Sequence, residues 1–269
     1  MKKLFYILLL LSATIISCKK DTVSEPDPAA GLNKLTEGYA AGAATKIEVY
    51  TEETAIYSGY TKLYIALYDS VSGHRIEEAH VQLTPMMDMG TMQHSAPYEN
   101  PGEKALDHLF TGSVTFIMSS MGGGAWTVKI RVHNHSTDKE GSLIIPVTVA
   151  EPAKARIKSF TALHDSAKYF VALLNPSSPK TGINDMELAI YKKISMMSFL
   201  PDSSLSVVLT PEMPAMGHGS PNNVNPLHSG AGHYNGKVNF TMTGLWRLNL
   251  DFTAGNAVAD STQFFDIEF

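Results

Sequence analysis

The sequence lacks the short motifs that mark common enzyme active sites. It contains no Gly-x-Ser-x-Gly elbow, no phosphate-binding P-loop and no His-Glu-x-x-His zinc motif. Cysteine is nearly absent, since Cys18 is the only one in 269 residues. The glycine run at 122–124 precedes a predicted strand, where a hairpin turn explains it better than phosphate binding. We therefore predict that the protein is not an enzyme.

Positive charge and long apolar stretches are also scarce. With Lys2 and Lys3 set aside as part of a targeting segment, 19 basic side chains stand against 26 acidic ones, a net charge of −7. No basic stripe concentrates the remaining lysines and arginines, which argues against nucleic acid as a partner. After the first 17 residues, no apolar run approaches the length of about 20 residues that a transmembrane helix needs.

The first 17 residues have the organisation of a signal peptide. Lys2 and Lys3 provide a positive start, an apolar run follows at 4–11, and residues 12–17 are mostly small or β-branched. The apolar run is too short to cross a bilayer as a helix. We therefore predict a signal peptide at 1–17 and exclude it from the fold.

Ile15-Ile16-Ser17-Cys18 resembles the lipobox of bacterial lipoproteins, in which the cysteine becomes the acylated first residue. This resemblance implies a lipid anchor at Cys18 and the membrane as a partner; the alternative is an ordinary secretory signal with an unrelated cysteine. Once Cys18 is acylated no thiol remains, so we expect neither a disulfide nor a cysteine-ligated metal. The next residue is Lys19 rather than the aspartate that marks inner-membrane retention in enterobacteria. That difference favours the outer membrane, facing the periplasm or the cell surface.

The remaining chain divides into a tether and two domains. Residues 18–45 are polar and rich in small side chains without a sustained period, which predicts a flexible lipidated tether. About 250 residues are long for one β-sandwich and ordinary for two domains. We place the boundary near Glu151-Pro152, which gives a first domain at 46–150 and a second at 151–269.

Apolar residues alternate with polar ones along both domains, and this period of two is typical of half-buried strands. The alternation occurs in matching order in the two halves. Matching strands include Leu63, Ile65 and Leu67 with Met186, Leu188 and Ile190; Val114, Phe116 and Met118 with Val238, Phe240 and Met242; and Trp126, Val128 and Ile130 with Trp246, Leu248 and Leu250. The sequence therefore predicts an all-β protein made of two tandem immunoglobulin-like β-sandwiches.

Each half also contains a loop that opens with Thr-Pro and is rich in methionine and histidine. Thioether and imidazole donors at close spacing suit Cu(I) and suit hard cations poorly. The candidate ligands are Met213, Met216, His218, His228 and His233 in the second half, and Met86, Met87, Met89, Met92, His94 and His108 in the first. The second loop also holds Pro214 and Gly217, which predict an irregular segment. The alternative is that these methionines cap the open end of each sandwich.

The second half carries a longer pattern: Met-Pro-x-Met-x-His from Met213, then His-Tyr-x-Gly-x-Val-x-Phe-x-Met-x-Gly-x-Trp from His233. It resembles the YtkA-like and FixH-like extracytoplasmic domains, and the first half resembles them more weakly. The resemblance implies small β-sandwiches and, for FixH-like proteins, an association with copper handling. FixH-like proteins carry a transmembrane helix, and this sequence has none after its signal peptide.

These features together predict a lipid-anchored protein of the cell envelope. Its loops would bind copper as Cu(I), for sequestration or for transfer with a copper-donor or copper-acceptor protein. The alternative belongs to a different class, a non-metal interaction module that holds a protein or glycan through its sandwich loops.

Overall fold

A computed structural model describes residues 27–121 and 123–269 of the chain. The predicted signal peptide at 1–17, Cys18 and the beginning of the predicted tether lie outside the described residues. Within the described part every regular element is a β-strand, which confirms the prediction of an all-β protein. No helix in that part is long and apolar enough to cross a membrane.

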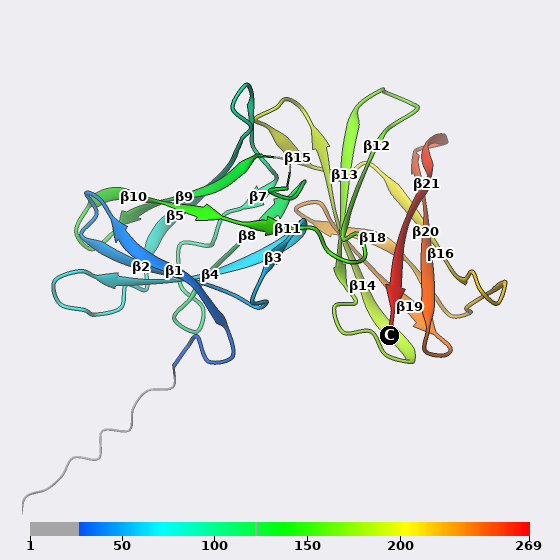
Figure 1. The fold of residues 1–269 in the computed structure, drawn as a ribbon, viewed down its shortest axis with the longest axis horizontal. Helices are drawn as coiled ribbons and strands as arrows, with labels where there is room; N and C mark the ends of the chain where they lie inside the picture. The colour runs from blue at the N-terminus through cyan, green and yellow to red at the C-terminus, as the bar shows by residue number, and fades with distance from the viewer. Residues whose placement is uncertain (1–26, 122) are drawn as a thin grey trace, which may run out of the picture.

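The strands form two units that lie side by side (Figure 1). In the first unit, one sheet has the order β1-β2-β4-β8-β7 and the other β10-β9-β5-β6, while β3 and β11 form a short parallel pair. Their bounds are β1 (Asn33–Ala40), β2 (Thr45–Thr51), β3 (Ile56–Tyr57), β4 (Gly59–Asp69), β5 (Ala79–Asp88), β6 (Gln93–His94), β7 (Tyr98–Glu99), β8 (Phe110–Phe116), β9 (Ala125–Asn134), β10 (Lys139–Val147) and β11 (Val149–Ala150).

The second unit repeats this arrangement. One sheet has the order β12-β13-β14-β19-β18 with β15 added beside β14, and the other has the order β17-β16-β20-β21. Their bounds are β12 (Ile157–Thr161), β13 (Lys168–Asn175), β14 (Gly182–Lys193), β15 (Phe199–Pro201), β16 (Ser206–Met213), β17 (His218–Gly219), β18 (Val224–Gly230), β19 (His233–Phe240), β20 (Leu245–Ala254) and β21 (Ala257–Glu268). Read strand by strand, the two units have the same order in both sheets.

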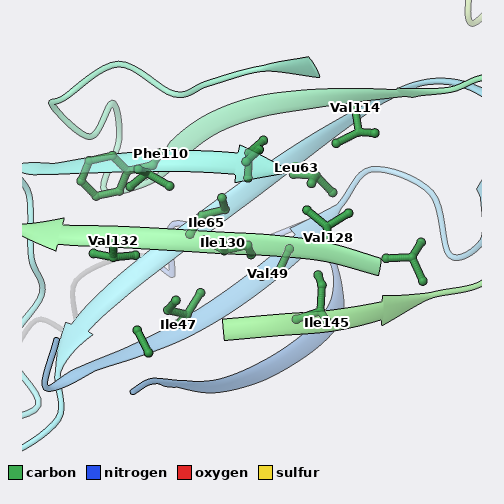
Figure 2. Close-up of a cluster of buried hydrophobic side chains, with 14 of the residues drawn as sticks. Ile47, Val49, Leu63, Ile65, Phe110, Val114, Val128, Ile130, Val132 and Ile145 are labelled. Carbon is green, nitrogen blue, oxygen red and sulfur yellow. The ribbon is translucent and has the colours of Figure 1, made fainter. Parts of the chain in front are cut away.

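Each unit has its own apolar core between its two sheets. In the first unit, alternate residues of facing strands meet between the sheets, as Figure 2 shows for Ile65 of β4 and Ile130 of β9. The core of the second unit is built in the same way around Leu188 and Leu250. Side chains that alternate along a strand point to opposite faces of the sheet, so the period of two in the sequence produces these cores directly.

The tether predicted at 18–45 is wrong for its second half. Strand β1 lies inside it and pairs antiparallel with β2, from Asn33 opposite Thr51 to Ala40 opposite Thr45. Of this edge strand only Leu35 and the terminal Ala40 contribute to the core, and the polar side chains between them gave no apolar alternation. A polar composition is usual for an edge strand because it prevents pairing with other chains. Composition alone therefore did not separate this strand from a tether.

Candidate functional site

In the first unit, three side chains form a row on the inner face of one sheet. Met87 near the end of β5 lies opposite His94 of β6 on one side and opposite Trp126 of β9 on the other. Residues directly opposite each other in an antiparallel pair project to the same face. His94, Met87 and Trp126 are all buried, and we call them the first corner.

The two rings of the first corner approach each other beside the methionine. The centroids of the His94 and Trp126 rings are 5.3 Å apart and the ring planes are nearly perpendicular, at 84°. The indole Nε1 of Trp126 donates a hydrogen bond of 3.0 Å to the carbonyl of Met118. This bond satisfies the polar atom of the buried indole and fixes the ring in place.

The hydrogen bond of His94 determines which ring nitrogen carries the proton. Its Nδ1 lies 2.8 Å from the carbonyl oxygen of Ser95. A carbonyl oxygen only accepts, so Nδ1 is the protonated nitrogen, and in the neutral ring Nε2 carries the lone pair. Histidines that bind metals commonly have this arrangement, in which one nitrogen donates to a carbonyl and the other is the ligand.

The second unit contains the same three residue types at the same place. Met213 at the end of β16 is opposite His218 of β17, and the pairing of Glu212 with Arg247 brings Met213 beside Trp246 of β20. We call His218, Met213 and Trp246 the second corner. The rings of His218 and Trp246 are 5.8 Å apart at 78°, and Trp246 donates a bond of 2.9 Å to the Met242 carbonyl.

The histidine of the second corner also has the same tautomer. Nδ1 of His218 lies 2.9 Å from the carbonyl oxygen of Gly219, so Nε2 carries the lone pair here too. The two corners differ in exposure: the His94 residue is only 5% exposed, whereas His218 is half-buried.

A glycine two residues before each tryptophan makes room for the thioether. A Cβ at Gly124 would lie 2.0 Å from Cε and 3.0 Å from Sδ of Met87. A Cβ at Gly244 would lie 2.9 Å from Cε of Met213. Such distances are too short for any side chain without movement of the methionine, so both thioether ends rest directly against the backbone before the tryptophan.

Three more predicted ligands lie in the turns beside the corners. In the first unit Met89 and Met92 are 38% and 50% exposed in the turn between β5 and β6, and in the second Met216 is 60% exposed in the turn between β16 and β17. Met86 is opposite Thr127 and alternates with Met87, so its side chain projects to the other face of the sheet. The second loop is also more regular than predicted, because β16 continues through Met213 and β17 follows at His218.

The other predicted histidines are not brought to the corners. His108 is exposed and pairs with Glu77 at 2.7 Å. His228 lies on β18 with its ring 5.3 Å from that of Tyr234, in the sheet opposite the second corner. His233 is part of a separate cluster at the junction of the units. Among the described residues, no group of three or more histidine, aspartate or glutamate side chains is arranged to hold a metal ion.

The junction cluster is built on Glu99 of the first unit. One of its oxygens, Oε1, is 2.9 Å from Nε2 of His233 and accepts a 2.9 Å bond from the hydroxyl of Tyr191, both in the second unit. The other, Oε2, accepts a 3.0 Å bond from Tyr60. Nδ1 of His233 lies 2.8 Å from Oε1 of Glu187, so both nitrogens of this histidine face carboxylates.

The charges in the junction cluster stabilise one another. The hydrogen bond with Glu99 raises the pKa of His233 above its ordinary value, against the opposing effect of burial. Burial alone would raise the pKa of Glu99, but the hydrogen bond and charge of His233 outweigh it and hold that pKa below its usual range. Burial raises the pKa values of Tyr60 and Tyr191, which keeps both phenols as donors. Sequence reasoning missed this cluster because Glu99 and His233 are 134 residues apart.

Fold and site together define a class: a tandem antiparallel β-sandwich protein with a duplicated Met–His–Trp corner. Residues 164–251, which include the second corner, match the model of the YtkA-like family. This match covers part of the second unit only. The first unit resembles the second in its strand order and in its corner. No curated protein matches the chain.

Several solved structures are distantly similar. The Escherichia coli adhesin FdeC is 15% identical with a TM-score of 0.27, over 86% of this chain and 65% of that one. Domains 5–6 of the S-layer protein SbsC are 13% identical with a TM-score of 0.29, over 88% and 98%. A conserved domain protein from Bacillus anthracis is 10% identical with a TM-score of 0.33, over 90% of both chains. This chain spans less than two thirds of the FdeC chain, and likenesses this distant do not bear on function.

Proposed function

We propose that this protein binds Cu(I) at the two Met–His–Trp corners, for sequestration or for transfer with a copper-donor or copper-acceptor protein. We propose further that it is anchored to the cell envelope through lipidated Cys18, in the outer membrane. The donors are Met87 and His94 in the first corner, and Met213 and His218 in the second.

One observation supports the copper proposal most strongly. In both corners the histidine directs Nδ1–H at the carbonyl of the next residue, and the methionine lies beside it on the neighbouring strand. Histidines that serve only as packing need no common tautomer, yet both copies adopt the same one. The same pairing of a neutral imidazole and a thioether in two units supports a shared role in binding.

The chemistry of the donors favours Cu(I) over harder ions. Thioether sulfur is a soft donor that contributes little to binding Zn²⁺, Mg²⁺ or Ca²⁺, and imidazole suits copper. The adjacent indole offers an electron-rich face, which attracts a cation. Burial of Met87 and Trp126 excludes water from the first corner and shields Cu(I) from oxidation.

Variants of the donor pairs test the copper proposal. In residues 27–269, which keep β1, the wild type should take up two equivalents of Cu(I) under anaerobic competition with a chromogenic Cu(I) chelator. Met87→Leu with His94→Gln should leave one equivalent, and so should Met213→Leu with His218→Gln. Loss of these ligands should lower the affinity of the affected corner for Cu(I) at least ~10-fold. This is the lower end of the loss seen when residues that only support a metal ligand are replaced. Zn(II) should bind more weakly at both corners.

The matched control is His228→Gln, which removes an exposed imidazole outside the corners and should leave both equivalents in place. Thermal melts of every variant separate ligand loss from unfolding. Two equivalents of Cu(I) held with wild-type affinity by the donor-pair variants would show that the corner residues only fill the core.

The anchor proposal has its own test. Wild-type protein should partition into detergent and incorporate a labelled fatty acid, and Cys18→Ala should lose both properties while residues 27–269 keep their fold. Unchanged membrane retention of the Cys18→Ala protein would contradict a lipid anchor at this position.

A second candidate function is the non-metal interaction module. Strand β18 is at the edge of its sheet and exposes Val224 and Leu227, the latter by 71%. Pro226 and the irregular register of β18 disfavour addition of a further strand, but exposed apolar side chains at a sheet edge form a surface that a partner protein can cover. Binding of a partner protein that is lost in Leu227→Lys, together with no Cu(I) uptake by the wild type, would favour this candidate.

A further inference from the structure

A turn of the second unit rests against the loop of the first corner. The backbone N–H of Ser95, the residue after His94, donates a 2.9 Å hydrogen bond to the carbonyl of Met196. Met196 lies in the turn at 194–198 that joins β14 to β15, and Figure 1 shows β15 beside the first unit. The first corner is therefore bordered by two turns, one from each unit.

Both bordering turns expose methionine side chains. On the first-unit turn Met89 and Met92 are 38% and 50% exposed, and on the second-unit turn Met196 and Met197 are 38% and 50% exposed. Single exposed apolar residues are ordinary, but here four thioethers lie in two turns that flank His94, one two residues before it in the chain and one joined to Ser95 by a hydrogen bond. Leucine or isoleucine would fill such a surface equally well if only apolar contact were needed.

The position of the patch relates it to the first corner. His94 and Met87 are buried, and the exposed thioethers of the two turns lie within a few residues of them, along the chain or across the bond to Ser95. In the second unit the equivalent histidine, His218, is more exposed, and its turn carries Met216. Each corner thus has a buried methionine donor and exposed thioethers in the turn beside it, and the first corner is also joined to a methionine-bearing turn of the other unit.

We propose that Met89, Met92, Met196 and Met197 form an entry surface that receives Cu(I) and passes it to Met87 and His94. The proposal rests on the copper function proposed above. Passage consists of ligand exchange, in which one thioether replaces another and finally the imidazole binds. The ion stays Cu(I) throughout and no electron is transferred. Lys193 has its ammonium nitrogen 3.1 Å from Sδ of Met196 and must move aside when Met196 binds.

The test measures the rate and the affinity of loading separately. The full chain in detergent carries Met213→Leu and His218→Gln, so that only the first corner loads and Trp126 reports it by fluorescence quenching. Cu(I) is delivered from a Cu(I)–chelator complex in a stopped-flow instrument. Met196→Leu with Met197→Leu should slow loading about tenfold, or about 1.4 kcal/mol in activation free energy, with little change in equilibrium affinity.

Two controls keep this result specific. Met216→Leu removes an exposed thioether of the other unit and should leave the loading rate of the first corner unchanged. Met to Leu preserves bulk and apolarity, and unchanged thermal melts confirm that the turn still packs. An unchanged rate in the Met196 and Met197 variant would overturn the entry surface. So would an affinity loss as large as the rate loss, since it would make these methionines resident ligands. Absence of any Cu(I) uptake by the parent chain would instead reject the copper function itself.

Discussion

Replacing Trp246 by alanine should unfold the second unit well before the first. The Trp246 side chain is completely buried, packs against the Phe240 ring at 5.5 Å and donates its N–H to the Met242 carbonyl. Truncation of a buried tryptophan costs about 3–5 kcal/mol, and it also leaves that carbonyl without its donor. A small domain is stable by about 5–15 kcal/mol, so the loss removes a large part of the stability of the unit.

The separate cores make this effect local. The core of the first unit includes residues from Ala40 to Val149 and that of the second from Phe160 to Ile267. In calorimetry, Trp246→Ala should lower the transition of the second unit and leave that of the first in place. Trp126 should keep its native emission through the first of these transitions. Trp126→Ala is the matched control and should give the reverse order. One shared transition in both variants would contradict independent cores.

The fold was predictable to the extent that it depends on local alternation. The period of two along Leu63, Ile65 and Leu67 placed β4, and the same pattern placed β14 around Leu188. Burial alternates along these strands because one face meets the core, so the sequence carries the signal directly. Strand β1 was not predicted, because a strand at the edge of a sheet requires few apolar residues.

The candidate site was predictable in composition and not in geometry. Nothing in the order of residues separates Met86 from Met87, since only the register of β5 against β9 directs one to the core and the other away from it. Likewise His218 and His233 lie in one loop-rich stretch of sequence, but pairing assigns them to different sheets. Cross-strand partners depend on topology, which sequence spacing does not encode.

The contacts at the junction between the units could not be predicted from the spacing of residues in the sequence. Glu99, Tyr191 and His233 lie on three strands and meet only after both sandwiches have formed and docked. Glu99 has no distinguishing neighbours in the sequence, and the motif that begins at His233 indicated a metal-binding loop rather than a carboxylate partner. Their role follows entirely from the hydrogen bonds of the folded protein.

The junction should be most stable in mildly acidic solution. The pKa of His233 is raised in the folded protein, so its contribution is complete below its unfolded pKa of about 6.5 and is lost as pH rises through the folded value. The pKa of Glu99 is lowered, so its contribution is present above about 4.3 and is lost as pH falls through the folded value. The two contributions coincide between about pH 4.3 and 6.5. Tyr60 and Tyr191 stay neutral throughout, because their pKa values are raised.

Glu99→Gln should remove the dependence of the stability of the junction on the protonation of His233. Glutamine keeps the size of the side chain and deletes the charge, so the pKa of His233 should fall toward its ordinary value. The lost charged hydrogen bond should cost about 1–2 kcal/mol at pH 6, a figure reduced because these groups are partly exposed. NMR titration of the His233 ring measures the pKa, and melting of both units between pH 4 and 8 measures the stability.

Glu103→Gln is the matched control for Glu99→Gln. Glu103 also faces a histidine, His80, but at 3.7 Å and with both side chains largely exposed. Exposed ion pairs contribute roughly 0–1 kcal/mol, so this variant should leave the pH profile of wild type nearly unchanged. A second ion pair crosses the junction, between Arg156 and Glu53 at 2.6 Å. It stays intact in both variants and keeps the units together during the measurement. If His233 titrates at the same pH in wild type and in Glu99→Gln, the carboxylate of Glu99 does not hold the proton on that ring, and the charge-based account of the junction is wrong.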